Sequence, residues 1–380
     1  SINKDNGGRY YFYRGLNNGG WEKVGASLSQ AETTHIHVYF VYDKGLTTVD
    51  TLDNNEHGIT MTMTNLENND QTGLLGTAGP TVTVDGTTYY NVEQGILNRT
   101  LDENGYPTLS GYKWNGKRNE GASLETLFTK ADTTTPVNHL FLSSTYENTG
   151  YYEYSSFANY AYLNPENNFI VYDALGTPKK NDKQFFYQRG NFLPYNNIVR
   201  DKYSDLKNLY DEDGERLTEE DPNYNAPLYL AGAGKAVDYH FAMTLNVQFY
   251  QPKDGLAEFG GRSDDMIYEF NGDDDLWVFI DDVLVLDIGG IHDAHSGYIN
   301  FHTGEVYIEL GMNSDGTVID PYRSTIKELF QQAGKFPDGS DWDKNATDDE
   351  IAKHFTGNTF SDYSRHTMKI FYMERGEGAC

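Results

Sequence analysis

Apolar and polar residues alternate strictly along several stretches of the chain, and this alternation is the clearest structural signal in the sequence. In residues 35–43 (HIHVYFVYD) and residues 238–250 (DYHFAMTLNVQFY), every second residue is apolar, and these apolar side chains share one face. A period of two residues is typical of a strand with one buried face, because successive side chains of a β-strand point to opposite faces. We therefore predict a half-buried strand in each range.

Between residues 264 and 373 the apolar segments are shorter and follow one another closely. They are DDMIYEF, LWVFI, VLVLDI, YINF, EVYIEL and HTMKIFYM, separated by NGDDD, DD, GGIHDAHSG and HTG. This spacing predicts an antiparallel β-sandwich and not βαβ units. Asp281-Asp282 and His302-Thr303-Gly304 stand where hairpin turns belong. Trp277 could stack on a sugar, but its place inside LWVFI favours packing in the core.

Helix signals are few and lie between the strands. Residues 324–334 begin with Ser324 as an N-cap candidate and end on Gly334, and residues 348–357 and 123–132 have a similar frame. Residues 144–227 are rich in Tyr, Asn and Gly with weak periodicity, which indicates an ordered, loop-rich insertion.

We therefore predict an all-β protein: an antiparallel β-sandwich with a large loop-rich insertion and a few short helices. No Pro/Ser linker divides the chain, which favours one elaborated domain over residues 1–380. Within it, residues 1–237 are expected to form N-terminal strands and a Tyr-rich elaboration, and residues 238–380 the sandwich core.

The composition narrows the classes of partner. The chain has 57 acidic and 29 basic residues and a formal charge of −28, which argues against nucleic acid and anionic membrane surfaces as partners. The one cysteine, Cys380, excludes an internal disulfide and a thiolate metal cluster. No apolar stretch approaches the roughly 20 residues of a membrane helix, so we expect no membrane insertion by this fragment. Abundant Tyr, Gly, Asn and Thr with little Cys is typical of extracellular adhesins of Gram-positive bacteria.

The densest acidic segment runs from Asp264 to Asp293, with ten carboxylates and no Lys or Arg. Such clusters are often solvated turns, but like charges this close also recruit a counter-ion. Hard oxygen ligands without cysteine favour calcium. Asp273 and Asp274 can share one ion only if the backbone between them departs from regular β geometry. The segment DWDKNATDDE begins with EF-hand-like spacing but lacks the required Gly, so a capped helix start explains it better.

Two histidines follow in the loop GGIHDAHSG. His292 and His295 have a spacing that can chelate zinc, although histidines in glycine-rich loops are more often turn or hydrogen-bonding residues. Beside a sugar site, His292 and Asp293 would be donors or acceptors for hydroxyl groups.

The segment NGDDDLWVFIDDVLVLDIGGIHDAHSGYINF, followed later by HTMKIFYMERGEGA, resembles the fibro-slime branch of the protective-antigen-type β-sandwich family. That family is known in bacterial surface proteins and is related to fungal flocculin lectins. The resemblance covers residues 238–380 and implies an Asp-Asp pair, joined by a cis peptide bond, that holds calcium. The ion would take two neighbouring sugar hydroxyls as ligands, and a loop between the last two strands would complete its shell.

Transferred to this chain, the resemblance implies two sets of site residues. Asp273 and Asp274 correspond to the pair, with Asp275 as a competing assignment, and the second loop is ERGEGA. The implied metal ligands are Asp273, Asp274, Asp275, Glu374 and Glu377, and the implied ligand-binding residues are His292, Asp293, Arg375 and Gly376. Arg375 has an alternative role, in which its guanidinium pairs with the acids and replaces the ion.

The same residues argue against an enzyme. Glycosidases use two acids separated by roughly 5 to 10 Å, which adjacent acids in one tight loop do not provide. The sequence also lacks a G-x-S-x-G elbow and a credible thiol nucleophile.

We expect a calcium-dependent carbohydrate-binding adhesin domain on a bacterial cell surface, part of a larger anchored protein. Its partner would be a glycan or glycoprotein on a host or neighbouring cell. The alternative is a structural or protein-binding module of a cell-surface fibre with a purely stabilising metal site.

Overall fold

The structure is a computed structural model that describes four short strands within residues 9–43 and then residues 48–173, 190–196, 238–343 and 345–376. Residues 35–40 of the first predicted strand and most of residues 174–227 of the predicted insertion lie outside the described residues. The chain divides into two compact units, residues 1–51 with 153–238 and residues 52–152 with 239–380. Residues 52–152 therefore belong with the C-terminal core, which differs from the expected boundary at 237/238.

The first unit contains three two-stranded antiparallel pairs, β1 with β4, β2 with β3, and β11 with β12. These strands are β1 Arg9–Tyr11, β2 Tyr13–Gly15, β3 Trp21–Lys23, β4 Val41–Asp43, β11 Asn159–Leu163 and β12 Phe169–Asp173.

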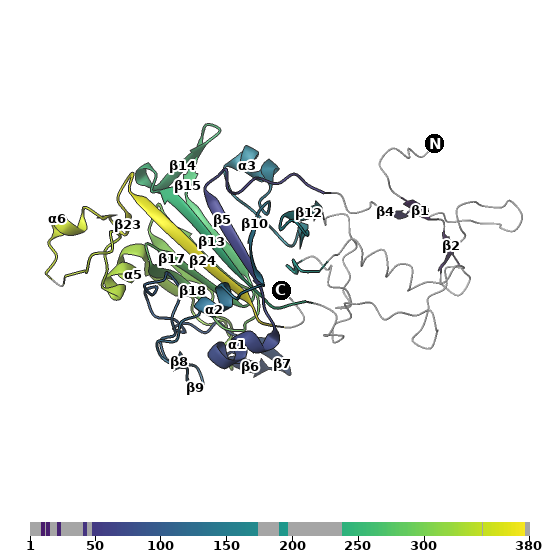
Figure 1. Cartoon of the computed structure of the whole chain (residues 1–380), viewed down its shortest axis with the longest axis horizontal. Coiled ribbons are helices and arrows are strands. Elements are labelled where there is room, and N and C mark those ends of the chain that lie inside the picture. Colours follow the sequence, from purple (N-terminus) through teal and green to yellow (C-terminus); the bar gives the residue numbers. More distant parts are fainter. Residues whose placement is uncertain are drawn as a thin grey trace, which may run out of the picture. The chain divides into compact units, whose positions relative to one another are not determined.

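The second unit is built on a six-stranded antiparallel sheet in the order β10-β5-β13-β24-β17-β18 (Figure 1). Its strands are β5 Ile59–Asn65, β10 Thr134–Val137, β13 Phe241–Tyr250, β17 Asp275–Ile280, β18 Val283–Ile288 and β24 Arg365–Glu374. β13 and β24 pair along ten residues each, from Phe241 opposite Glu374 to Tyr250 opposite Arg365. The strand predicted over residues 238–250 is thus confirmed.

A second antiparallel sheet, in the order β16-β19-β20-β21, contains β16 Ile267–Gly272, β19 His295–Asn300, β20 Glu305–Ile308 and β21 Tyr322–Thr325. Its inner face, with Ile299, Val306 and Ile308 fully buried, packs on the β18 side of the first sheet. There Gly297 approaches Ile288 so closely that an added Cβ would lie 2.5 Å from its Cδ1. The two packed antiparallel sheets make the fold all-β and sandwich-like, as predicted.

The opposite face of the first sheet is covered by residues from the 66–128 segment. Trp277 and Phe279 of β17 pack there with Phe371 of β24, Leu75 and Phe128. Because both of its faces are covered, every residue of β17 is buried, although a strand with one solvated face would alternate. Trp277 is 0% exposed, so its predicted place in the core is confirmed.

Smaller elements decorate this unit. The hairpin strands are β6 Thr81–Val84 and β7 Thr87–Tyr90, β8 Tyr112–Lys113 and β9 Gly116–Lys117, β14 Leu256–Phe259 and β15 Arg262–Asp265, and β22 Phe355–Thr356 and β23 Thr359–Phe360. The helices are α1 Asn68–Leu75, α2 Glu125–Phe128, α3 Ser143–Thr149, the 3-10 turn η1 Lys253–Gly255, α5 Ile326–Ala333 and α6 Asp348–Ile351. None of the described helices is long and apolar enough to cross a membrane.

The predicted helices exist, but they are shorter than the predicted ranges. α5 is capped by Thr325 and not by Ser324, because the Thr325 side chain accepts from the backbone N–H of Glu328 in a capping box. Gly334 ends it in the left-handed conformation, as predicted. The helices predicted over residues 123–132 and 348–357 shrink to the single turns of α2 and α6.

The tight hairpin predicted at Asp281-Asp282 is confirmed. Both residues have positive φ, 47° and 64°, between the ends of β17 and β18. Two successive positive φ values are the signature of the turn that matches the twist of paired strands, and Asp tolerates them better than most residues.

Candidate functional site

The acidic residues Asp273 to Asp275 lie at the point where the chain leaves β16 and enters β17. Asp274 has a φ of 55°, so the backbone departs from β geometry between the two strands. All described peptide bonds are trans. The prediction of a cis bond between Asp273 and Asp274, which the family resemblance implied, is therefore wrong. The left-handed turn at Asp274 is what separates the directions of the neighbouring carboxylates.

The Asp274 carboxylate is 2% exposed and is enclosed by the chain that follows β24. Its Oδ2 atom accepts the backbone N–H of Arg375 at 2.7 Å and that of Gly376. The Gly376 N–H also points to Oε1 of Glu374, 2.9 Å away. A Cβ at Gly376 would lie 3.2 Å from Glu374 Oε1 and 3.3 Å from Asp274 Oδ2, so only glycine leaves both carboxylates undisturbed.

The neighbouring carboxylate, Asp275, is fully buried, and each of its oxygens accepts from a protein donor. Its Oδ1 atom accepts the backbone N–H of Gly290 at 2.6 Å, and its Oδ2 atom accepts from Nε of Arg375 in a buried salt bridge. Arg375, 5% exposed, also donates from Nη1 to the carbonyl of Gly76 at the end of α1, 3.0 Å away. The alternative in which Arg375 pairs with the acids is therefore confirmed for Asp275.

Burial changes the proton affinity of the two preceding acids. Desolvation, followed by repulsion from Asp274, raises the pKa of Asp273 to about 7. Desolvation also raises the pKa of Asp274 to about 6, although the Arg375 charge opposes the shift. Asp273 thus has the higher pKa of the two, because no cation offsets its desolvation as Arg375 does for Asp274.

His292 and Asp293 lie beside these acids. His292 is 3% exposed, and burial lowers the pKa of its imidazole to about 4, so the ring is neutral at neutral pH. Its Nδ1 lies 2.7 Å from the carbonyl oxygen of Asp293. Asp293 is exposed, and its Oδ2 accepts the backbone N–H of Tyr90 at 2.9 Å. Its charge contributes to the raised pKa of Asp273.

The structure thus brings together most of the predicted site residues, but not as metal ligands. Among the described residues no three His, Cys, Asp or Glu side chains form a group that could hold a metal ion. Asp274 and Asp275 bind backbone N–H groups and Arg375, whose guanidinium stands where a cation was expected. Glu377 lies outside the described residues. Calcium binding at this cluster therefore stays a prediction.

A second buried ion pair lies next to the first and was not predicted. Glu93 and Arg118 form a two-point pair, with Nη1–Oε1 at 2.6 Å and Nη2–Oε2 at 2.9 Å. Arg118 also donates from Nη2 to the carbonyl of Leu75 at 3.0 Å. Two arginines, 118 and 375, therefore hold the C-terminal end of α1, where positive charge complements the helix dipole. No local sequence pattern signals a pair that joins residues 25 positions apart.

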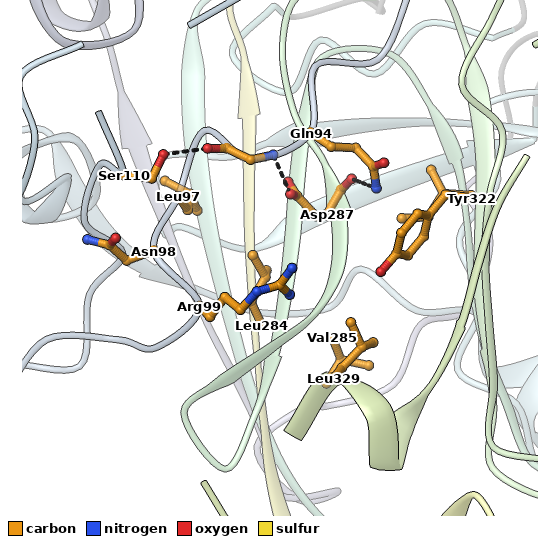
Figure 2. A pocket seen from close by; sticks show the side chains of 12 residues that line it. Gln94, Leu97, Asn98, Arg99, Ser110, Leu284, Val285, Asp287, Tyr322 and Leu329 are labelled. Atoms are coloured by element: carbon orange, nitrogen blue, oxygen red, sulfur yellow. Dashed lines mark hydrogen bonds between the residues drawn. The ribbon is translucent and has the colours of Figure 1, made fainter. Parts of the chain in front are cut away.

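A pocket of about 410 Å³ opens beside β18, away from the acidic cluster (Figure 2). Its floor is apolar and comes from β18, β20, α5 and the 94–110 segment: Leu97, Leu284, Val285, Ile308 and Leu329. Its polar lining consists of Gln94, Asn98, Arg99, Ser110, Asp287 and Tyr322. This volume lies within the range of small-ligand sites, and an apolar floor with a few polar groups is their usual composition.

Asp287 is the most constrained polar group of the pocket. Its Oδ2 accepts the backbone N–H of Gly95 at 2.7 Å, and its Oδ1 accepts the indole N–H of Trp277 at 3.1 Å. Burial raises the pKa of Asp287 to about 6. The Gln94 amide donates to the backbone carbonyl of Asp287 at 3.3 Å, as Figure 2 shows. These bonds attach the 94–95 turn to β18.

A third arrangement has the connectivity of a hydrolase triad. His366 Nε2 lies 2.6 Å from Ser364 Oγ, and its Nδ1 lies 2.6 Å from Oδ2 of Asp281. However, the Ser364 hydroxyl donates to the carbonyl of Ser361 at 2.5 Å, so its proton is not directed at the imidazole as in an activated nucleophile. The His366 ring is 4% exposed and stacks on Phe360. The arrangement therefore ties the β17–β18 turn to β24.

Comparison with known proteins gives short matches. No family model matches the chain, and no solved structure matches it. Protein psiJ of Dictyostelium discoideum is 32% identical over 120 residues, which cover 25% of this chain and 15% of psiJ. Protein psiD of the same organism is 32% identical over 131 residues, 34% of this chain and 19% of psiD. Protein psiF is 59% identical over 34 residues, 9% of this chain and 5% of psiF. The matched regions span less than a fifth of these relatives.

These matches correct the family assignment made from the sequence. The relatives are eukaryotic proteins, and nothing among the matches points to bacterial fibro-slime adhesins. The predicted membership of the fibro-slime branch is therefore wrong, and the site roles that it implied have no support from it.

Proposed function

We propose that the chain is a non-catalytic carbohydrate-binding module of an extracellular adhesin and that its ligand site is the pocket beside β18. The observation that carries this proposal is the pocket itself, about 410 Å³ with an apolar floor and six polar side chains in its lining. A sugar ring presents apolar C–H faces and a rim of hydroxyls, and this lining complements both.

The hydrogen bonds of the lining leave capacity for a ligand. The carboxylate of Asp287 accepts one bond at each oxygen, and each oxygen can accept a second from a sugar hydroxyl. Gln94 and Asn98 use their amide N–H groups within the protein, which leaves their carbonyl oxygens as acceptors. The phenol of Tyr322 adds a hydroxyl that can donate or accept.

The acidic cluster supports a different role. Arg375 neutralises Asp275 internally, so the cluster stabilises the end of β17 without a bound ion in this geometry. Calcium dependence of ligand binding stays a prediction, and no step of the proposal depends on it.

The internal ion pair between Arg375 and Asp275 also favours a second candidate function, a structural module of a cell-surface fibre. Two buried Arg–carboxylate pairs around one helix end suit a domain whose task is to hold its shape. In that case the pocket would bind no glycan.

A glycan array with the unmodified chain, with calcium and with a chelator, separates these possibilities. We expect binding that is lost in Tyr322→Ala, because the substitution removes one wall of the pocket, and the chelator arm tests the predicted calcium dependence. Tyr250→Ala is the matched control, since Tyr250 is 56% exposed on β13 and does not line the pocket.

Two results would overturn the proposal. Absence of binding to all glycans would support the structural module. Calcium-dependent binding that survives Tyr322→Ala and disappears in Asp273→Asn would move the site to the acidic cluster.

A further inference from the structure

Arg99 differs from the other arginines whose side chains the structure describes. The remaining five each have a partner: Arg118 binds Glu93, Arg262 donates to the Asn148 carbonyl, Arg323 binds Glu305, Arg365 donates to the Tyr250 hydroxyl, and Arg375 binds Asp275. The Arg99 guanidinium is exposed and has no ion pair or hydrogen bond with any described residue. Among the described arginine side chains, Arg99 is therefore the one whose guanidinium is left free to bind a ligand.

The backbone at Arg99 is held firmly although its side chain is free. Its carbonyl accepts the backbone N–H of Leu284 at 2.8 Å, and Thr100 forms a β-bridge with Val283. The backbone N–H of Leu101 donates to the carbonyl of Asp282 at 3.1 Å. The 99–101 segment thus runs along the otherwise open edge of β18. A charged side chain on a fixed backbone is organised for binding before a ligand arrives.

The nearest acid in the pocket does not neutralise this cation. Each oxygen of Asp287 already accepts an N–H, from Gly95 and from Trp277, and Arg99 influences it only as a nearby charge. A free carboxylate, in contrast, matches the planar guanidinium with two parallel hydrogen bonds.

A second free donor faces the same space. Figure 2 shows the Arg99 guanidinium and the Tyr322 hydroxyl pointing into the pocket from opposite walls. The Tyr322 hydroxyl has no hydrogen-bond partner among the described residues. Leu284, Val285 and Leu329 line the floor below them. A ring with apolar faces and one carboxylate would use all of these groups together.

We propose that the pocket binds an acidic sugar residue of the uronic-acid class, with the carboxylate on the Arg99 guanidinium and the ring over Leu284 and Leu329. This inference rests on the proposed carbohydrate-binding function and adds the class of sugar to it. The Tyr322 hydroxyl donates to the same carboxylate or to a neighbouring ring oxygen, and Asp287 accepts from a ring hydroxyl.

The test compares pairs of probes that differ in one group. Methyl uronides of the gluco, galacto and manno series are titrated against the chain by NMR, each beside its neutral methyl hexoside. At least one uronide is expected to bind about tenfold or more tightly than its neutral parent, the contribution of a charge-assisted two-point hydrogen bond.

Variants then assign the effect to Arg99. Arg99→Gln is expected to remove most of the preference for the uronide over its neutral parent. Its thermal unfolding midpoint should not move, because the guanidinium has no partner to lose. Arg262→Gln is the control, since it removes the same charge from an exposed hairpin and should keep the preference.

The outcomes separate this inference from the proposed function. If neutral hexosides bind in the pocket and no uronide binds more tightly, the acidic-sugar inference is wrong and the carbohydrate module stands. A preference that Arg99→Gln retains also contradicts it. If neither the uronides nor the array glycans bind, both proposals fail.

Discussion

The acidic cluster Asp273 to Asp275, at the entrance to β17, and the pocket beside β18 lie on neighbouring strands of one sheet. They use their charged groups in opposite ways. At the entrance, Asp274 and Asp275 are buried and every strong interaction they make is with the protein itself, through Arg375, Gly376 and Gly290. In the pocket, Arg99 is exposed and has no described partner.

This difference indicates which charged groups of the molecule are available to bind a ligand. A dense cluster of acids attracts attention in the sequence, but a buried charge has to be paired, and pairing leaves little for a ligand. An unpaired arginine that lines a pocket from a fixed backbone is more informative, because no interaction among the described residues requires its charge.

The largest expected effect tests the entrance. Arg375→Met leaves Asp275 buried without its cation, and we expect a loss of about 3–5 kcal/mol in the free energy of unfolding, measured in urea. Asp275→Leu combined with Arg375→Met should recover much of the loss, because no unpaired charge remains. Arg365→Met, on the exposed end of β24, is the control and should cost less than about 1 kcal/mol. An equal cost for both single variants would mean that the entrance pair is not what stabilises this end of β17.

The next effect is the pH dependence of stability. The folded-state pKa values of Asp273, Asp274 and Asp287 are about 7, 6 and 6, all raised mainly by desolvation from an ordinary value of 3.8. Between these limits the folded protein holds more protons than the unfolded chain, so stability falls as the pH rises from about 4 to 7.

Asp273→Asn should reduce the loss of unfolding free energy over this pH range by roughly 1–3 kcal/mol. The reason is that it removes the acid with the highest pKa of the three. Urea unfolding at a series of pH values measures it. Millimolar calcium at pH 8 should leave the wild-type midpoint unchanged. A clear rise of the unfolding midpoint with calcium would show that the acidic cluster binds the ion. It would contradict the contrast with the pocket.

A smaller effect is expected at the buried His366. Ser364→Ala removes its bonds to Ser361 and His366 and should cost about 1 kcal/mol in unfolding free energy, as for other neutral hydrogen bonds. A serine-directed fluorophosphonate should not label the wild-type chain. Labelling at Ser364 that is lost in Ser364→Ala would instead reveal a reactive serine. Ser296→Ala, on the other sheet, is the control for the stability measurement.

The smallest effect on the fold is expected in the pocket. Tyr322→Phe removes a hydroxyl without a described partner, so the unfolding free energy should stay within about 0.5 kcal/mol of wild type. Binding of the preferred uronide should weaken about fivefold, the equivalent of one hydrogen bond near 1 kcal/mol. Unchanged binding would place the ligand away from this wall and weaken the contrast between free and committed polar groups.

Strand and turn predictions succeeded where the signal was local. The alternation over residues 238–250 became β13, the Asp281-Asp282 pair became a positive-φ hairpin, and Trp277 became core. The N-cap of α5 was misplaced by one residue, because Ser324 and Thr325 are equivalent by type and only the bond to Glu328 selects Thr325.

The site predictions had mixed success for a different reason. Asp274, Asp275, Glu374, Arg375 and Gly376 do meet, because the strands β17 and β24 that precede or follow them pair in the sheet. Their roles could not be predicted, because a carboxylate that binds Arg375 and one that binds calcium look the same in a sequence. Arg99 was missed because its importance lies in the absence of a partner, which no local pattern records.

The sequence by itself determined the all-β character, the principal strands of the core and the sharp turns, because the period of apolar residues and the preference of Asp for positive φ act within a few residues. Only the tertiary structure decided which charges are paired and which are free. That outcome depends on contacts between residues as far apart as Arg375 and Gly76, or on the lack of such contacts at Arg99, and these distances are set by the packing of the two sheets and the segment that covers them.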